Sequence, residues 1–373
     1  MSKILITGWQ GFIGLNLFTH LEKQEDTKLL KFGSDNSEKD LKSMLNECDI
    51  IFHLAGVNRC KSDDHFYSGN VDLTKKICDY LIDLNRKPKI IFSSSTQIEN
   101  DSIYGKSKLM AENVLKKYQK KSNSQIVIYR LPGVFGKWSK PNYNTVVATF
   151  CNNIARDLPI QISDKNKNIY LAYIDDVISD FKNEIDYNDG NQVQYKKIEP
   201  VYNITLGHLV EKITFFHESR NTLLIPDFKD LFMKKLHATF LSFLPKENFA
   251  YELTKMSDER GVLAEFIKSQ SKGQIFVSTT NPGKIRGNHY HHTKIEKFLI
   301  LSGNGIIRFK SIINCDEVFS YEVSGKEFKV VDIPPGFTHS IENIGNDKMV
   351  VLFWSSEIYN QDNPDTDYFP VQE

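Results

Sequence analysis

Short, unbroken apolar runs alternate with amphipathic stretches through residues 1 to about 180. The stretches between the runs carry apolar residues at three- and four-residue spacing, which is typical of helices. Strands that alternate with helices are joined by right-handed crossovers and form a parallel sheet with helices on both faces. We therefore expect a doubly wound α/β domain, with buried strands at "KILIT", "LLKF", "DIIFHLAG", "KIIFSSS" and "IVIYR".

A helical pattern over about 203–245 ends at Pro245, and a different sequence pattern follows. Short strand-like runs then recur between Gly and Pro signals, with almost no helical pattern. Such spacing favours a small all-β barrel or jelly roll. We expect one domain at 1–245 and another at 246–373.

The charge balance excludes some classes of partner. Lys+Arg and Asp+Glu both number 47, so no global field favours nucleic acid or an anionic membrane. The five cysteines are scattered without a Cys-x-x-Cys pair, which argues against a disulfide framework and a cysteine zinc cluster. No apolar run approaches the roughly 20 residues of a membrane span, and no leader precedes "KILITG". We expect a cytoplasmic protein.

Three glycines, Gly8, Gly11 and Gly14, follow the first expected strand and open the first expected helix. In that context they predict a dinucleotide cradle, because glycine allows close approach to a pyrophosphate that faces the helix N-terminus. The second strand ends in Gly33-Ser34 rather than an acid, which favours NADP(H), with Lys31 or Ser34 as candidate phosphate contacts. Asp35 just beyond weakens that inference.

A candidate catalytic set lies further along. Tyr104 and Lys108 are four residues apart and share a helical face, so the ammonium can lower the pKa of the phenol. Ser95 closes a strand and can hold the same carbonyl oxygen that Tyr104 protonates. Without the glycine cradle, an amphipathic surface pair would be the better interpretation of Tyr104 and Lys108.

Together these residues resemble the extended short-chain dehydrogenase/reductase family, whose fold is Rossmann-type. Further matches are "HLAG" at 53–56, Asn70-Val71, "YRLPGVFG" at 129–136 and "YIDDV" at 173–177. The resemblance covers 1 to about 245 and implies a nucleotide-activated sugar in the cleft, although the loop from Ser95 to Tyr104 is shorter than usual. His53 would be structural. The implied cofactor contacts are Thr7, Gly8, Gly11, Phe12, Ile13, Gly14, Ser34, Leu54, Ala55, Gly56, Tyr104 and Lys108.

The second half carries "GNHYHHTKIEKF" at 287–298. On a strand, His289 and His291 point to one face and His292 to the other. With Glu296, and with His339 from a neighbouring strand, they form an N3O set that suits zinc, manganese, iron or nickel, and zinc is our expectation. A solvent-facing histidine strand is the alternative.

The spacing of these residues matches the cupin family. Within the cupins, "DERGVLAEF" at 258–266, "IRGNHY" at 285–290 and "IPPGFTH" at 333–339 look like the 3,5-epimerases of nucleotide 4-keto-6-deoxysugars. There the position of His289 is a general base and metal is usually absent, so here His289 is either base or ligand. Arg260 and Arg286 suit pyrophosphate or carbonyl contacts, with surface ion pairs as the alternative.

The whole chain resembles the bifunctional capsule and O-antigen enzymes on the route to UDP-N-acetyl-L-fucosamine. The resemblance implies a cupin that epimerises C3 of a UDP-2-acetamido-2,6-dideoxy-4-ketohexose. It also implies an NADPH-dependent reduction of C4 to a UDP-2-acetamido-2,6-dideoxy-L-talose, and a homodimer. Asn142 and Asn144 would meet the UDP-activated keto-deoxysugar.

Two rival interpretations remain at this stage. One is an NAD-dependent nucleotide-sugar epimerase or dehydratase with a structural cupin, although "SSSTQIE" lacks the usual Asp-Glu pair of a dehydratase. The other is a nucleotide-binding regulatory or scaffold protein without turnover, which the presence of both Tyr104 and Lys108 disfavours.

Overall fold

The computed structural model describes residues 2–59, 62–143, 145–187, 190–314 and 317–372. The chain divides into two compact units, Met1–Thr214 with Lys235–Pro245, and Phe215–Lys234 with Lys246–Glu373. The segment Phe215–Lys234 belongs to the second unit, since Ile225 N donates to Lys268 O and Lys268 N donates to Leu223 O. The single domain boundary expected between residues 245 and 246 therefore misses this earlier segment of the second unit.

The first unit is built on a six-stranded parallel sheet, which confirms the prediction. Ile4 and Ile6 point into one core and Leu5 into another, so both faces of the sheet are buried at the central strands, which are largely apolar. The strands, in spatial order, are β2 (Thr27–Phe32), β1 (Ser2–Thr7), β3 (Ile50–His53), β4 (Lys89–Ser95), β5 (Ile126–Leu131) and β8 (Val193–Lys196).

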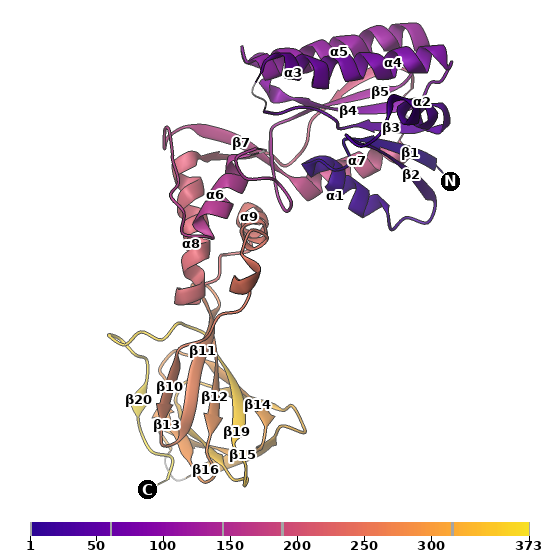
Figure 1. The fold of residues 1–373 in the computed structure, drawn as a ribbon. Coiled ribbons are helices and arrows are strands. Elements are labelled where there is room, and N and C mark those ends of the chain that lie inside the picture. Colours follow the sequence, from indigo (N-terminus) through magenta and orange to yellow (C-terminus); the bar gives the residue numbers. More distant parts are fainter. Residues whose placement is uncertain (1, 60–61, 144, 188–189, 315–316, 373) are drawn as a thin grey trace. The chain divides into compact units, whose positions relative to one another are not determined.

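Helices cover both faces of this sheet (Figure 1). One layer contains α1 (Phe12–Leu21) and α7 (Ile174–Asp186). The other contains α2 (Glu38–Glu47), α4 (Leu73–Asp83) and α5 (Ile103–Ser122). Short helical turns precede α4 and α5: α3 (Asp64–Tyr67), η1 (Ser68–Asp72) and η2 (Thr96–Glu99).

A smaller mixed sheet joins β6 (Gly133–Phe135), β7 (Asn168–Tyr173) and β9 (Tyr202–Thr205), with α6 (Val146–Ile154) between β6 and β7. The helical prediction for 203–245 is wrong at its start, because Tyr202–Thr205 pairs with β7 as a strand. It holds for α8 (Leu206–Thr222) and α9 (Leu231–Leu241), which the turn η3 (Lys246–Asn248) follows.

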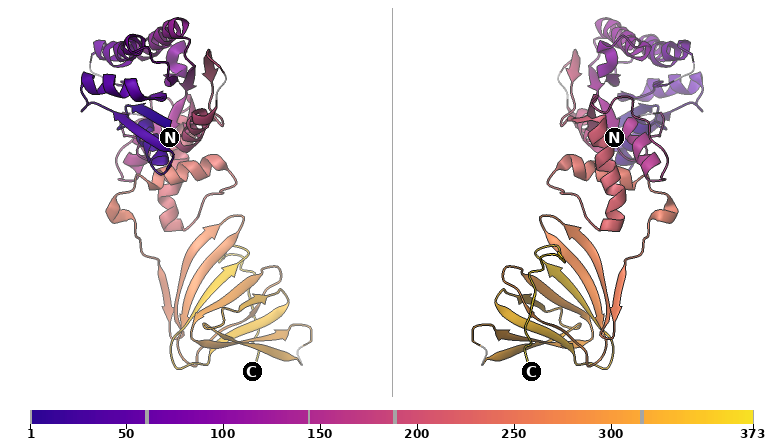
Figure 2. Two further views of the ribbon diagram at one scale, coloured as in Figure 1. Left: turned by 90° about the vertical axis from the view of Figure 1, so that its right-hand side faces the viewer. Right: turned by 90° about the vertical axis from the view of Figure 1, so that its left-hand side faces the viewer.

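The second unit is an antiparallel β-sandwich, as the turn-rich sequence predicts (Figure 2). Its core contains Phe298, Ile300, Ile307, Ile341 and Val351 from both sheets. One sheet has the order β10 (Lys255–Asp258), β11 (Gly261–Ser269), β12 (Gly273–Thr280), β19 (Met349–Ser355), β14 (Glu296–Ser302) and β17 (Val330–Ile333). The other has the order β16 (Val318–Ser324), β15 (Asn304–Ser311), β18 (Phe337–Asn343), β13 (Ile285–Tyr290) and β20 (Asp367–Tyr368).

Among the described residues, none of the helices is long and apolar enough to span a bilayer. Cys48, Cys78 and Cys151 are buried free thiols, and Cys60 and Cys315 lie outside the described residues.

Candidate active sites

A pocket of about 1040 Å³ opens at the carboxyl ends of β1 to β5, where ligands bind in doubly wound sheets. The segments that follow these strands supply most of its lining. Of the residues predicted to bind cofactor or to act in catalysis, the lining includes Gly8, Gly11, Phe12, Ile13, Gly14, Ser34, Leu54, Ala55, Gly56, Ser95, Tyr104 and Lys108.

The glycine turn shapes this pocket by close packing. Gly8 has φ +69°, and a Cβ there would lie 2.7 Å from the backbone of Ala55. Gly11 is the N-cap of α1, and none of the described side chains caps that end of the helix. The first amides of α1 are thus available to an anion such as a pyrophosphate.

Thr7 differs from the prediction, because it is fully buried beneath the turn instead of lining the pocket. Its hydroxyl bonds His53 Nδ1 at 2.8 Å and accepts a hydrogen bond from Ala55 N at 3.3 Å. His53 Nε2 bonds the Thr74 hydroxyl at 2.9 Å. Thr7 therefore supports the cradle from below, and His53 is placed as a structural residue.

His53 makes the stability of the first unit depend on pH. Burial, with the nearby charge of Lys108, lowers the pKa of His53 from 6.5 to about 3. Between these values the unfolded chain binds the proton and the folded chain does not, so stability falls as pH drops below 6.5. We expect a loss of about 2 kcal/mol between pH 7 and pH 5 at about 1.4 kcal/mol per pH unit.

The measurement is urea unfolding of Trp354→Phe protein, which leaves Trp9 and Trp138 as fluorescent probes in the first unit. His53→Gln in this background should abolish the extra loss. His65→Gln, at an exposed histidine, is the control and should retain it. An equal pH dependence with and without His53 would contradict the assignment.

Ser95, Tyr104 and Lys108 all line the pocket, and the side chains of Ser95 and Tyr104 form a hydrogen bond. Ser95 ends β4, and its hydroxyl accepts a hydrogen bond from Gln97 N at 3.1 Å. Tyr104 lies in the first turn of α5, which Ser102 caps, and Lys108 follows one turn later. Lys108 Nζ donates to Ser93 O at 2.8 Å and lies 4.8 Å from the centre of the Phe92 ring.

Burial is the largest cause of the pKa shifts of both Lys108 and Tyr104. Burial lowers the pKa of Lys108 to about 8, against a raising influence of Glu112. Burial raises the pKa of Tyr104, and the Ser95 hydroxyl lowers it only in part. Desolvation therefore outweighs the predicted lowering of the phenol pKa, and the ammonium that was expected to cause this lowering is bound to Ser93 O.

Near the end of β2, the structure differs from expectation at Lys31. Its ammonium lies 4.9 Å and 4.6 Å from the ring centres of Trp9 and Phe18, and the residue is not in the lining. Ser34 does line the pocket, and its hydroxyl donates to Asp35 at 3.2 Å. Gln10 Nε2 also donates to Asp35, at 3.1 Å.

Arg59, Lys140 and Tyr143 are among the polar lining residues to which the sequence analysis assigned no role. They occur in "AGVNR" and "FGKWSKPNYN", segments that matched only as part of the overall resemblance. Asn142 does not line the pocket, but its carbonyl accepts a hydrogen bond from Arg59 Nη1 at 2.8 Å. Asn144 lies outside the described residues.

A second site lies between the sheets of the β-sandwich. His289, His291, Glu296 and His339 each offer a ligand atom, and these atoms all lie within 4.8 Å of one another. His291, Glu296 and His339 are buried, and His289 is the most accessible of the four. Burial first, and then His339, lower the pKa of His289 to about 4.

His289 and His291 point to the same side, as alternation along a strand predicts, since both belong to the cluster and His292 is exposed. β13 ends at Tyr290, but His291 O still accepts a hydrogen bond from Gly336 N at 2.9 Å. The two ring centroids lie 5.0 Å apart.

A β-bulge at Gly287 and Asn288 changes which side chains of β13 face inward. Arg286 pairs with Ile341, and His289 pairs with His339. Two residues lie between Arg286 and His289 on β13, but only one lies between His339 and Ile341 on β18. Ile341 and His339 point to one face, so Arg286 and His289 share it, which regular alternation would forbid. Gly287 has φ +95°, and a Cβ there would lie 2.7 Å from His339 O.

The four side chains fit a divalent metal. His291 Nε2 and both ring nitrogens of His339 are buried without a hydrogen-bond partner among the described residues. Each such atom costs about 1–3 kcal/mol if it stays unsatisfied. Glu296 Oε2 lies 3.4 Å from His291 Nε2 and 3.6 Å from His339 Nε2. Ligand bonds of about 2.0–2.2 Å in a tetrahedron give separations of roughly 3.3–3.6 Å.

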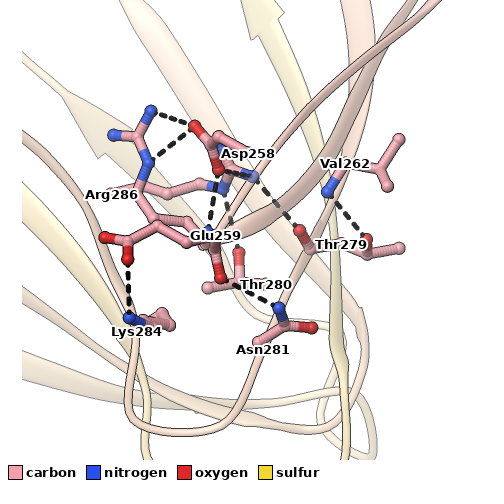
Figure 3. Close-up of polar contacts among 9 residues, drawn as sticks. Asp258, Glu259, Val262, Thr279, Thr280, Asn281, Lys284 and Arg286 are labelled. Atoms are coloured by element: carbon pink, nitrogen blue, oxygen red, sulfur yellow. Dashed lines mark hydrogen bonds and ion pairs between the residues drawn. The ribbon is translucent and has the colours of Figure 1, made fainter.

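Arg286 and Arg260 both form ion pairs with Asp258. Figure 3 shows Asp258 and Arg286 with the neighbouring Thr279 and Thr280. Arg260 forms a close, half-exposed ion pair with Asp258, which matches the surface-pair alternative. Arg286 is more buried, lies 3.8 Å from Asp258, and donates to Thr280 Oγ1 and Thr279 O at 3.3 Å. Arg286 therefore places a positive charge on the interior face that also carries His289.

Two family models match this chain. Residues 4–182 match the NAD dependent epimerase/dehydratase family, and residues 256–367 match the polysaccharide biosynthesis C-terminal domain. A relative from Pseudomonas aeruginosa, UDP-2-acetamido-2,6-beta-L-arabino-hexul-4-ose reductase, is 40% identical over 98% of this chain and 97% of its own length.

Solved structures of similar proteins extend over both units. The capsular polysaccharide assembling protein CapF from Staphylococcus aureus is 42% identical, with a TM-score of 0.91 over 99% of this chain and 100% of that one. CapF with the inhibitor 3-isopropenyl-tropolone is 38% identical, with a TM-score of 0.86 over the same shares. This chain therefore belongs to the family of UDP-sugar 4-keto reductases, in which a short-chain dehydrogenase/reductase unit precedes a polysaccharide-biosynthesis C-terminal domain.

Proposed function

We propose that this protein is a bifunctional enzyme of capsule or O-antigen synthesis. The β-sandwich inverts C3 of a UDP-2-acetamido-2,6-dideoxy-4-ketohexose. The first unit then reduces C4 with NADPH and forms a UDP-2-acetamido-2,6-dideoxy-L-talose. The observation that carries this proposal is the presence, on one chain, of a dinucleotide-type pocket with Ser95, Tyr104 and Lys108 and a separate His/Glu cluster.

The reductase step needs a proton at the oxygen that receives the new charge. NADPH, when bound, supplies the hydride. Tyr104 donates its phenolic proton to the C4 oxygen, and the Ser95 hydroxyl hydrogen-bonds the same oxygen. Lys108, held by Ser93 O, places a positive charge one helical turn from the phenol and stabilises the phenolate that remains.

NADPH is favoured over NADH by the end of β2. No acid follows Phe32 directly, and Ser34 lines the pocket. The Asp35 carboxylate is engaged by Ser34 and Gln10, which leaves it less able to grip a ribose hydroxyl.

The epimerase step needs a base and a way to stabilise charge on the C4 oxygen. His289, the most accessible member of the cluster, takes the C3 proton, and the electron pair moves into the C3–C4 bond as the C4 oxygen becomes an enolate. Arg286 faces the same interior and stabilises that oxygen. Reprotonation from the opposite face of C3 inverts its configuration.

His291, Glu296 and His339 would hold a divalent metal, with His289 beside them. This donor set of two histidine nitrogens and one glutamate oxygen suits zinc, which when bound would supply Lewis-acid polarisation of a carbonyl. Tropolones carry two adjacent oxygens able to chelate a divalent ion, so 3-isopropenyl-tropolone is a useful probe of this assignment.

Inversion must precede reduction, because only the ketone makes the C3 hydrogen acidic. Once C4 is an alcohol, the new configuration at C3 is fixed. The two sites therefore form an ordered pair that uses one carbonyl twice.

The test is NMR of the product formed from the UDP-4-keto sugar in deuterated water. Without NADPH we expect deuterium at C3 of the ketone, and with NADPH we expect a C4 alcohol that carries deuterium at C3. Reduction without label at C3 would refute the epimerase. Tightly bound NAD⁺ with no net oxidation of NADPH would instead favour an internal redox epimerase or dehydratase.

A further inference from the structure

The segment that carries His291 lies outside the β-ladders, so its backbone amides need partners other than a neighbouring strand. Residues 291–295 lie between β13 and β14 and belong to neither strand. The amides of His292, Thr293 and Lys294 are successive donors that must be satisfied somewhere. Their partner is distant in the sequence.

That partner is Asp365, in the segment after β19. One oxygen of its carboxylate accepts from His292 N at 2.8 Å. The other accepts from Thr293 N at 2.8 Å, from the Thr293 hydroxyl at 2.9 Å and from Lys294 N at 2.7 Å. Burial raises the pKa of Asp365, but these bonds outweigh it and hold the pKa well below its usual range. A single carboxylate thus defines the shape of the turn.

The backbone of Asp365 acts on His291 itself. Its carbonyl lies 2.5 Å from His291 Nδ1. A carbonyl can only accept, so Nδ1 must carry the proton, and in the neutral ring Nε2 is left with its lone pair. Nε2 is the atom that faces Glu296 at 3.4 Å. The contact therefore fixes the tautomer that a metal ligand needs.

The segment around Asp365 is itself anchored to β13 and β18. β20 pairs with His289 and Tyr290. Phe369 N donates to Asn288 O at 2.9 Å, and the Thr338 hydroxyl donates to Phe369 O. Val371 is buried, and its amide donates to Asn288 Oδ1 at 3.2 Å. The residues that follow Asp365 are thus held by β13, which carries His289, and by β18, which carries His339, and these contacts fix the position of Asp365.

We propose that residues 364–371 are a clamp that prepares the histidine cluster for metal, with Asp365 as its positioning residue. The carboxylate sets the turn and the carbonyl sets the tautomer of His291. This inference rests on the proposed metal site and adds a requirement for a segment that supplies no ligand to it.

The test is the zinc affinity of the full chain, measured by competition with a chelator of known affinity. Asp365→Ala should weaken zinc binding about 10- to 100-fold, as the loss of an outer partner of a metal ligand does. Deletion of residues 364–373 removes the carbonyl as well and should weaken it further. Asp367→Ala is the matched control, because the side chain of this exposed acid forms an ion pair at 3.4 Å with His292, which is exposed as well.

A second readout separates positioning from general damage. In ¹⁵N-histidine NMR of the metal-free protein, we expect His291 to be protonated at Nδ1 in the parent chain and in Asp367→Ala, and to lose that preference in the truncated chain. Fluorescence of Trp354 in β19 reports whether the second unit stays folded. Asp365→Asn, which is nearly isosteric, should fold and give an intermediate loss of affinity.

The outcomes distinguish the clamp from the metal site. Unchanged zinc affinity in Asp365→Ala and in the truncated chain would overturn the clamp while the metal site stands. An equal loss in Asp367→Ala would also overturn it. If the parent chain and His291→Ala bind zinc equally weakly, the proposed metal site fails first.

Discussion

Replacing Tyr104 by Phe is expected to reduce NADPH-dependent ketone reduction by about 10²–10⁴-fold, the range for a lost general acid. The phenylalanine fills the same space, so the pocket and its dinucleotide affinity should survive. Deuterium exchange at C3 should proceed at the parent rate, because the second site does not use this phenol. NADPH oxidation and NMR of the sugar measure the two steps in the same sample.

Tyr170→Phe is the control for this substitution. Tyr170 lies on β7, is largely exposed and does not line the pocket, so both activities should remain. Loss of reduction and exchange together in Tyr104→Phe would contradict two separate sites. Retention of reduction would remove Tyr104 from the chemistry.

The second large effect is expected from His291→Ala. This change removes one of the four clustered donors and leaves the buried Glu296 with one partner fewer. We expect zinc affinity to fall by more than about 100-fold, beyond the loss of an outer partner, and C3 exchange to slow with it. Metal content after dialysis and exchange at saturating zinc measure the two effects separately.

His292→Ala controls for a change in the same turn. His292 is exposed and points away from the cluster toward Asp367, so metal content and exchange should match the parent chain. Unaltered metal content in His291→Ala would mean that the donor set is wrong. Full exchange activity without metal would assign the proton transfer to His289 alone.

The sequence predicts the parallel sheet well because its signal is local. Ile4, Leu5 and Ile6 must each be apolar when both faces are buried, and the glycine turn follows them directly. The residues that line the dinucleotide pocket come from segments just after the strands, so strand order alone places most of them. Thr7 is an exception, since its hydroxyl bonds the buried His53 instead of facing the pocket.

The histidine cluster was predicted only in part, because one of its causes is not local. Alternation along the chain places His289 and His291 on one side, yet His291 lies one residue beyond the end of β13. What holds it is Asp365, 74 residues away in the chain. A hydrogen bond between a side chain and a remote carbonyl leaves no periodic pattern that a sequence could show.

The extra residue at Gly287 and Asn288 limits how this sandwich can diverge through short insertions and deletions. A loop absorbs most insertions or deletions of one residue without a change in the strands beside it. Loss of Asn288 would instead restore strict alternation along β13, so the Arg286 guanidinium would point toward solvent while His289 stayed inside. The sandwich could still fold, but Arg286 and His289 would no longer face the same interior. Descendants of this fold that lost the insertion would therefore be expected to keep the sandwich and bind other ligands.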